Sequence, residues 1–427
     1  MTVTPTLLYN DMPIRWQCEL RHIFAPPARV TTISSRRGHC VQGIYGRVRY
    51  RDAEDAQSSL PRLKDIRLTA GDRFMKSVSV AMATYNGGLY LREQLQSLAA
   101  QIRAPEELVV TDDVSTDDTL AILAEFSHTA PFPVRVYVNT QRLGYRANFM
   151  RVAGMCSSDI IAFCDQDDVW RPDKLQRCVD VLERTDALLV YHNAIVTDSA
   201  LSPIGTLARF ALANSYNPPL SIDPFMGANG FTLVFDRQLV QFSSLWDRSI
   251  DINDGNNPNA HDQWYFFLAQ TLGALAYDDA PLVQYRRHGS AVTSSTWIGE
   301  SRLSKAPHFL FECLGRWEHI VLVSERRAAI MDEIAQEPAI PQAASARVGA
   351  EKYRAIARFY RERIELYNND RIVHRFRQFM GILTSGGYRS GDVWAKGPKS
   401  GIKDLLLGVL RVSRIVPATA KAKLRGY

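Results

Sequence analysis

The 427-residue chain lacks several features that would assign it to common classes of protein. No run reaches the roughly 18 consecutive apolar residues of a membrane-spanning helix, and the start of the chain has no signal-peptide apolar core. The six cysteines show neither paired metal-binding spacing nor the framework of a small disulfide-rich secreted protein. We therefore expect a cytoplasmic protein with reduced thiols.

The apolar content of 46% is ordinary for a globular protein, and the length exceeds that of a typical single core. We predict a catalytic domain over residues 75–300 and a basic, mostly helical extension over residues 301–427. Residues 1–74 are rich in Arg, are interrupted by Pro and have no sustained period. We expect this stretch to be disordered or not part of the native protein, with Met75 as the true start; a genuine appendage is the alternative.

Strands and helices alternate in the next part of the chain. Residues 77–83 form an apolar strand pattern that leads into a Gly-containing turn, and Leu91, Leu95 and Leu98 then recur at helical spacing. A strand at 107–111, a helix at 119–126 and a strand at 134–138 are expected to follow. This order predicts an α/β fold with a mostly parallel central sheet and helices on both faces. No G-x-G-x-x-G follows the first strand, which argues against a dinucleotide-binding oxidoreductase.

Three carboxylates stand directly after the apolar run Ile160–Cys164: Asp165, Asp167 and Asp168. Open α/β sheets bind ligands at the carboxyl ends of their strands, and carboxylate oxygens suit hard divalent cations. The pattern therefore predicts a metal and phosphate site. A solvated turn is the alternative for so short an acidic motif.

Four motifs in order resemble the inverting nucleotide-sugar glycosyltransferases of family 2, which have the Rossmann-like GT-A fold. They lie at residues 80–87 (VAMATYNG), 112–117 (DDVSTD), 143–149 (LGYRANF) and 165–170 (DQDDVW). Residues 260–264 (AHDQW) and 285–289 (YRRHG) are similar to the bacterial rhamnosyltransferase-like branch of that family. The resemblance extends from about Met75 to about Ser294.

The resemblance implies a nucleotide-sugar site at the ends of the first strands. It assigns to that site Thr84, Tyr85, Asn86, Asp112, Asp113, Gly144, Asn148, Asp165, Gln166, Arg286 and Arg287. Asp112 or Asp113 would accept the imide N–H of uracil or thymine, which fits a UDP- or dTDP-sugar. The alternative is an Asx-turn in which these carboxylates bond their own backbone, and both uses can coexist.

The resemblance also implies Mg²⁺ or Mn²⁺ at the donor diphosphate, held by Asp165, Asp167 and His288, with Asp167 as the most direct ligand. Mg²⁺ takes only one or two protein carboxylates, so an incomplete protein site is expected. Imidazole suits Mn²⁺ better, and a structural role is the alternative for His288. Arg286 and Arg287 are suited to diphosphate oxygens, but strand alternation lets only one of the two face the site.

Asp262 is implied to be the base that deprotonates the acceptor hydroxyl. It precedes the apolar segment Trp264–Ala276, which we expect to be a buried helix, so an N-terminal cap is the alternative. The helix dipole would lower its basicity, and we expect the base to act by proximity and desolvation more than by a raised pKa. His261 stands where the family often has Glu, and its function is open.

Gly227, Asn229 and Gly230 belong to a Gly-rich turn that, by resemblance, lies where donor sugar and acceptor meet. A plain turn before a strand is the alternative.

The end of the chain is strongly basic: from Gln342 onward there are 18 Lys and Arg against 6 Asp and Glu. A basic amphipathic helix over Gly401–Val416 would suit peripheral contact with an anionic membrane at the inner face of the cytoplasmic membrane. A helical hairpin covering the catalytic domain is the alternative. No motif supports nucleic-acid binding.

These features together predict a metal-dependent inverting glycosyltransferase. The expected donor is dTDP-rhamnose, and the expected acceptor is a lipid-linked or polysaccharide intermediate of a cell-surface glycan such as an O-antigen. The alternatives are transfer of another hexose from a UDP-sugar, and a catalytically silent scaffold that only binds nucleotide sugar.

Overall fold

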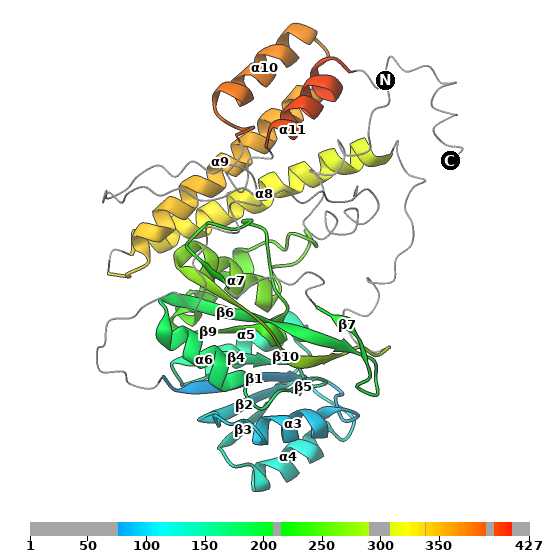
Figure 1. Cartoon of the computed structure of the whole chain (residues 1–427), viewed down its shortest axis with the longest axis vertical. Coiled ribbons are helices and arrows are strands. Elements are labelled where there is room, and N and C mark those ends of the chain that lie inside the picture. The colour runs from blue at the N-terminus through cyan, green and yellow to red at the C-terminus, as the bar shows by residue number, and fades with distance from the viewer. Residues whose placement is uncertain (1–75, 208–214, 290–307, 338, 390–396, 412–427) are drawn as a thin grey trace, which may run out of the picture. The chain divides into compact units, whose positions relative to one another are not determined.

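The computed structural model describes residues 76–207, 215–289, 308–337, 339–389 and 397–411 (Figure 1). The described residues fall into two compact units, one within residues 60–357 and the other from Arg358 onward. The predicted N-terminal extension, residues 1–74, lies outside the described residues, and the boundaries of the three predicted parts stay predictions. None of the described helices is long and apolar enough to cross a bilayer.

The first unit is built on one mixed sheet (Figure 1). Its described strands are β1 (Val78–Thr84), β2 (Glu107–Asp112), β3 (Val134–Val138), β4 (Ile160–Cys164), β5 (Val169–Trp170), β6 (Ala187–Thr197), β7 (Pro203–Thr206), β8 (Ser215–Asn217), β9 (Val234–Asp236) and β10 (Ala274–Arg286). The main order is β3-β2-β1-β4-β9-β6-β10-β5, with β7 paired to β6 and β8 to β10. The first four strands of that order are parallel, as are β6 and β10, and β9 joins the two groups by antiparallel pairing.

Helices cover both faces of this sheet because each strand sends alternate apolar side chains to opposite faces. They are α3 (Leu91–Ala99), α4 (Thr119–Thr129), α5 (Gly144–Met155), α6 (Lys174–Arg184) and α7 (His261–Leu272). Val80 and Met82 of β1 share one buried cluster with apolar residues of α3, α4 and α6. On the other face the ring of Phe163 in β4 lies 5.4 Å from Phe149 of α5 and 5.6 Å from Tyr265 of α7. The predicted α/β class is confirmed.

Helical structure dominates the rest of the described chain. The short 3₁₀ segments are η3 (Gly230–Thr232) and η4 (Arg237–Arg248). The later helices are α8 (His308–Gln336), α9 (Ala343–Asn368), α10 (Ile372–Thr384), α11 (Gly397–Lys403) and the π-helix η5 (Asp404–Val409). These elements confirm the expected helical C-terminal extension.

Three expected elements differ from the observed ones. The helix expected to reach Ala276 ends at Leu272, because the backbone of Gly273 is extended and Ala274 already begins β10. A Cβ at Gly273 would lie 2.6 Å from Leu188 of β6, so β6 approaches the chain closely at this turn. The apolar run Leu282–Tyr285, which predicts a short strand, is the end of this long β10, which pairs with β6 through bulges. The amphipathic helix expected from Gly401 is the end of α11 followed by a π-helix that ends at Val409. Residues 412–416 of that expected helix lie outside the described residues.

Candidate active site

The turns that follow β1 and β2 are tied together at the carboxyl edge of the sheet. The side-chain oxygen of Asn86 accepts from the Thr116 N–H at 2.8 Å, and the Asn86 N–H donates to Ser115 Oγ at 2.9 Å. The Gly88 N–H donates to Asp117 Oδ2 at 2.9 Å. Asn86 has a positive φ of 46°, a conformation that Asn tolerates better than most residues. The polar residues of both motifs therefore hold two loops in one arrangement.

Asp112 is fully buried at the end of β2 and bonds its own chain. Its carboxylate accepts from Thr84 Oγ1 at 2.8 Å and from the N–H and hydroxyl of Ser115 at 2.8 and 2.6 Å. The turn role considered for this Asp is present. A contact between Asp112 or Thr84 and a nucleotide stays a prediction.

Asp113 fixes the start of α5. It accepts from the N–H groups of Leu143 and Gly144 at 2.6 and 2.8 Å, and an acidic group is favourable at a helix N-terminus. Gly144 has a φ of 79°, which favours glycine. The buried Asn148 amide donates to the Thr111 carbonyl at 2.9 Å. Asp113, Gly144 and Asn148 thus shape the loop from within, and their direct contact with a nucleotide stays a prediction.

Gln166 bonds the backbone of Tyr85 in both directions. The Tyr85 N–H donates to Gln166 Oε1 at 2.9 Å, and Gln166 Nε2 donates to the Tyr85 carbonyl at 3.0 Å. A Cβ at Gly87 would lie 2.3 Å from Gln166 Oε1, so a side chain there would displace Gln166 from these bonds. The Tyr85 ring is 37% exposed and carries the Arg142 guanidinium 4.0 Å from its centroid. An exposed aromatic face is therefore presented beside the acidic motif.

Asp165, Asp167 and Asp168 converge after β4, with potential ligand atoms all within 4.8 Å of one another. Burial raises the pKa of Asp165 to about 8, with the Asp167 and Asp262 carboxylates adding to the shift. Burial and the same cluster raise the pKa of Asp168 well above its usual range. Among the described residues, Asp168 Oδ2 finds no hydrogen-bond partner. Crowded, desolvated carboxylates of this kind fit a divalent cation.

The last residue of β10 and the residues that follow it reach this acidic cluster. His288 Nε2 lies 2.8 Å from Asp167 Oδ2. Arg286 is buried, its N–H donates to Asp168 Oδ1 at 3.0 Å, and its Nε donates to the Asp167 carbonyl at 2.9 Å. Arg287 bonds β6 through its backbone N–H. Arg286 therefore braces the acidic loop, and phosphate contacts of either arginine stay predictions.

Asp262 occupies the second position of α7, and its Oδ1 accepts from the Gln263 N–H at 2.7 Å. Burial raises its pKa to about 6, and the Asp251 carboxylate adds to the shift. The alternative of an N-terminal cap does not hold, since the N-cap position is Ala260. The expectation of a base without a raised pKa was wrong, because desolvation outweighs the helix dipole and raises the pKa. Asp262 also helps to raise the pKa of Asp165, which places both carboxylates within electrostatic reach of each other.

His261 is buried beside Asp262 and stacks on the Phe149 ring at 3.9 Å. Burial lowers its pKa to about 3, so the imidazole is neutral at physiological pH. Among the described residues, neither ring nitrogen has a hydrogen-bond partner. The neutral imidazole therefore packs as an aromatic ring against Phe149 at the first turn of α7.

The expected acceptor region packs on that same turn. A Cβ at Gly230 would lie 2.5 Å from His261 Nε2, and one at Gly227 would lie 3.8 Å from the Gln263 side chain. Asn229 between them is half-buried. Residues 227–230 therefore contact the neighbours of Asp262 on both sides, which the sequence suggested only by resemblance.

Two charged residues that sequence reasoning missed support this site. Lys174 is fully buried at the start of α6, and its Nζ donates to the Phe231 carbonyl at 2.7 Å. Burial lowers its pKa to about 8. Arg146 Nη1 donates to Asp251 Oδ2 at 2.6 Å and to the Pro258 carbonyl at 2.7 Å, which ties α5 to the loop before Asp262. For Lys174 the sequence does offer a signal, a lysine on an apolar helix face. For Arg146 the sequence spacing offers no signal.

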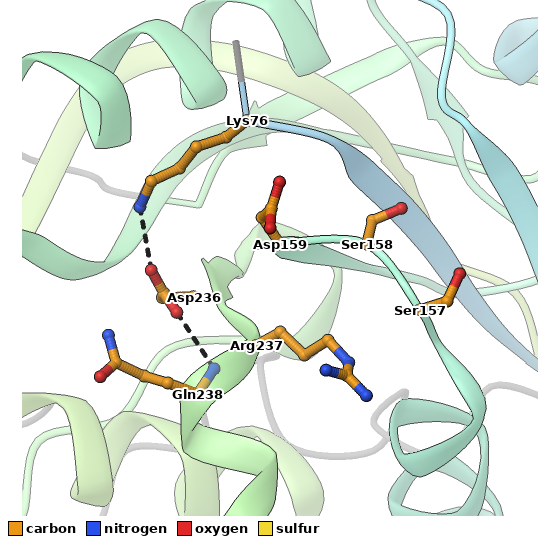
Figure 2. A pocket seen from close by; sticks show the side chains of 7 residues that line it. All are labelled: Lys76, Ser157, Ser158, Asp159, Asp236, Arg237 and Gln238. Carbon is orange, nitrogen blue, oxygen red and sulfur yellow. Dashed lines mark hydrogen bonds and ion pairs between the residues drawn. The ribbon is translucent and has the colours of Figure 1, made fainter. Parts of the chain in front are cut away.

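A pocket of about 490 Å³ lies at the opposite, amino edge of the parallel strands (Figure 2). It is lined by Lys76, Ser157, Ser158, Asp159, Asp236, Arg237 and Gln238. The Lys76 ammonium pairs with Asp236 at 2.9 Å, and Asp236 also accepts from the Gln238 N–H at 3.0 Å (Figure 2). These charges neutralise one another, whereas those at the carboxyl edge do not. The candidate active site is therefore at the carboxyl edge.

Comparison with known proteins agrees with this geometry. The family described as "Glycosyl transferase family 2" matches residues 79–247. The dTDP-rhamnosyl transferase RfbG of Shigella flexneri is 30% identical over 221 residues, which are 48% of this chain and 71% of that protein. An uncharacterized glycosyltransferase of Nostoc sp., alr2836, is 32% identical over 149 residues, 34% of this chain and 43% of the relative.

Among solved structures, S. aureus TarS 1–349 in complex with UDP-GlcNAc aligns at a TM-score of 0.44 and 14% identity, covering 78% of this chain and 92% of that one. Similarity at this level bears on neither substrate nor mechanism. The family match and the relative that shares 30% identity over 71% of its length are decisive: this chain is a glycosyltransferase and belongs to glycosyl transferase family 2.

Proposed function

We propose that this glycosyltransferase is metal-dependent and inverting, and that it moves rhamnose from dTDP-rhamnose to a lipid-linked or polysaccharide acceptor in cell-surface glycan synthesis. One observation carries the proposal. A cluster of three carboxylates, Asp165, Asp167 and Asp168, lies within electrostatic reach of a separate, half-buried carboxylate, Asp262, whose pKa is raised to about 6. The rhamnosyl donor is supported by the relative named as a dTDP-rhamnosyl transferase.

Mg²⁺ or Mn²⁺ would be held by Asp165 and Asp167, with His288 beside Asp167 at 2.8 Å. When bound, the ion would neutralise charge on the leaving nucleoside diphosphate. The residues fit such an ion because the ligand atoms of Asp165, Asp167 and Asp168 lie within 4.8 Å of one another, and Asp168 Oδ2 is buried without a partner among the described residues. Arg286 would keep the acidic loop in place through the Asp167 carbonyl.

Asp262 would serve as the general base. The acceptor hydroxyl oxygen attacks the anomeric carbon, its proton moves to the Asp262 carboxylate, and the bond from the anomeric carbon to the diphosphate breaks with its electron pair on the leaving group. A base with a pKa near the working pH is efficient at this task. The value of about 6 leaves most Asp262 groups ionised at pH 7.

The proposed nucleotide contacts are the exposed Tyr85 ring and the loop built by Asn86, Asp112 and Asp113. Both Asp side chains already accept hydrogen bonds from the protein, which favours a role in shaping that loop. The uracil or thymine ring would then bind to other groups of the loop. A UDP-hexose donor on the same machinery is the second candidate.

Donor binding by calorimetry tests this function. Purified protein is titrated with dTDP-rhamnose, UDP-glucose, UDP-galactose and GDP-mannose, with Mn²⁺ and then with EDTA. Binding of dTDP-rhamnose that EDTA abolishes is the expected result. Metal-dependent binding of a UDP-hexose alone would replace rhamnose as the proposed sugar and leave the proposed metal-dependent glycosyltransferase class in place. No binding of any donor would favour a catalytically silent scaffold.

A lipid-linked acceptor would bring the enzyme to a membrane surface. The exposed apolar residues of α10 lie on one side of that helix: Ile372, Val373, Phe376, Met380 and Leu383. Arg377 is exposed beside this apolar side, and the N-cap residue Arg371 is exposed at the start of the helix, which suits anionic lipid. We expect the protein to float with vesicles that contain phosphatidylserine, and Val373→Glu to abolish flotation. Equal flotation with purely zwitterionic vesicles would contradict an electrostatic contact.

A further inference from the structure

The acceptor segment, defined here as residues 224–230, begins at a carbonyl group that donors from three helices reach. The Pro224 carbonyl accepts from Gln270 Nε2 of α7 at 2.8 Å, from Arg327 Nη1 of α8, and from the Tyr353 hydroxyl of α9 at 3.5 Å. A carbonyl oxygen has two lone pairs, which the Gln270 amide and the Arg327 guanidinium can both use, while the Tyr353 hydroxyl lies at the limit of hydrogen-bond distance. Two side chains from different helices therefore hold the start of the acceptor segment.

Arg327 is the charged member of this anchor. Its side chain is 3% exposed, and its guanidinium lies 4.6 Å from the Phe267 ring centroid, 5.3 Å from Phe225 and 5.6 Å from Tyr353. Within the described part of the chain, no carboxylate forms an ion pair with it. The charge is thus held by three aromatic faces and one carbonyl, an arrangement that desolvated cation–π contacts can stabilise.

A buried charge of this kind is a poor choice for stability alone. Apolar side chains of similar volume often support folding equally well or better than buried ionic groups. The planar fork of the guanidinium fixes the direction of the bond to the Pro224 carbonyl. What Arg327 provides and an apolar residue does not is the fixed position of that carbonyl.

The position of that carbonyl matters for the acceptor. The acceptor segment runs from buried Pro224 through exposed Gly227 to Gly230, which contacts His261 next to the proposed base. Gln270 and Asp262 belong to the same helix, α7. The donors at Pro224 therefore set the distance between the acceptor segment and Asp262.

We propose that Arg327 is a positioning residue for the acceptor. By holding the Pro224 carbonyl, it fixes the acceptor segment against the first turn of α7 and so sets how the acceptor hydroxyl approaches Asp262. The proposal rests on the proposed function for the role of Asp262. It assigns to a helix outside the sheet, α8, a direct effect on transfer to the acceptor.

The test compares Arg327→Met with Arg354→Met in the full-length protein. Arg354 is also an arginine of the C-terminal helices, but it is exposed and pairs with Asp332. Hydrogen exchange of peptides covering residues 220–233 is measured together with two rates: hydrolysis of the bound donor by water, and transfer to alkyl glycosides of rhamnose, glucose and galactose.

For Arg327→Met we expect faster exchange in the acceptor segment and a ratio of transfer to hydrolysis lowered by about tenfold, since small misplacements of a reacting group are costly. Donor hydrolysis and exchange in β1 and β2 should be unchanged. Arg327→Lys should recover part of the ratio, and Arg354→Met should match the wild type. Gln270→Met removes a second donor to the same carbonyl and should act in the same direction if Arg327→Met does not fold.

Unchanged exchange in the acceptor segment, or a fall in hydrolysis equal to the fall in transfer, would overturn the proposal. Failure of the wild type to bind or hydrolyse any donor would instead refute the proposed function. The exchange measurement still reports on the anchor in that case, so the two failures are distinguishable.

Discussion

Two acidic sites of this protein differ in how their negative charge is balanced. In the second unit, Asp404 is fully buried and accepts from Arg363 Nε and Nη2 at 2.7 and 3.0 Å, from the Tyr367 hydroxyl at 2.9 Å and from the Tyr388 hydroxyl at 2.7 Å. In the first unit, the carboxylates that follow β4 are crowded together, and the pKa of Asp165 is raised to about 8.

The difference separates structural charge from functional charge. A buried ion pair contributes to a fold only when its geometry is good and its remaining lone pairs are satisfied, as they are at Asp404. Crowded carboxylates without a counter-charge repel one another when they are ionised, and a bound cation relieves that repulsion. Within the described residues, we therefore assign the acidic groups that lack a counter-charge to the binding of the sugar donor and the acceptor.

The largest effect is expected when the proposed base, Asp262, is replaced. Asp262→Asn removes the base and keeps the size of the side chain, so turnover should fall by about 10²–10⁴-fold. Donor affinity, measured by calorimetry, should change little because the base acts in the transition state. The exposed Asp247→Asn is the matched control. Normal turnover in Asp262→Asn would show that another group takes the proton.

The pH profile sharpens the same assignment. A base must be ionised, so kcat/KM should fall as the pH drops through the Asp262 pKa of about 6. His261 cannot produce this limb, because burial lowers its pKa to about 3. If the fall of kcat/KM at low pH persists in Asp262→Glu but its midpoint shifts to the pKa of the new carboxylate, the assignment is supported. A midpoint that does not depend on residue 262 contradicts it.

The next largest effect is expected when the buried ion pair between Asp404 and Arg363 is broken. Asp404→Asn leaves Arg363 buried without its counter-charge, which should lower the free energy of unfolding by about 3–5 kcal/mol. Denaturant unfolding measures the loss, and donor affinity should stay at the wild-type value. Asp370→Asn, which removes an exposed partner of Arg411 in the same unit, should have little effect. Equal destabilisation by both variants would remove the distinction drawn here.

The parts of this picture that sequence could supply are local. Strand period and turn residues place Thr84, Asp112 and Asp165 at strand ends, and parallel pairing brings those ends to one edge. The insertion of β9 between β4 and β6 is a long-range pairing that no period encodes. The same limit applies to the contact between Gly230 and His261, which joins segments from different elements.

Electrostatics is where local reasoning was wrong. The helix dipole near Asp262 is readable from its position before an apolar helix, but the burial that raises its pKa depends on packing against distant segments. Lys174 shows the same limit: its contact with the Phe231 carbonyl unites two segments 57 residues apart. Desolvation is a property of the assembled site, so it appears only with the fold.

A smaller but direct signature concerns the proton on the acidic cluster. At pH 7 Asp165 is mostly protonated because its pKa is about 8, and a metal requires the carboxylate. Binding of Mn²⁺ should therefore release about one proton at pH 7 and fewer as the pH rises above the pKa. Calorimetry in buffers of different ionisation enthalpy measures this. Heats that are the same in all buffers would show that the cluster binds metal without Asp165, or not at all.

The smallest effect is expected at the amino edge of the sheet, where the charges are paired but partly exposed. The Lys76 and Asp236 side chains are 35% and 18% exposed, so their bond at 2.9 Å is screened by solvent. Lys76→Met should change the free energy of unfolding by about 0–1 kcal/mol and leave donor binding and turnover unaltered. A large loss of donor affinity in this variant would mean that the pocket of Figure 2 takes part in substrate binding. Compensated charge would then no longer mark a purely structural site, and the rule that separates the two edges of this sheet would fail.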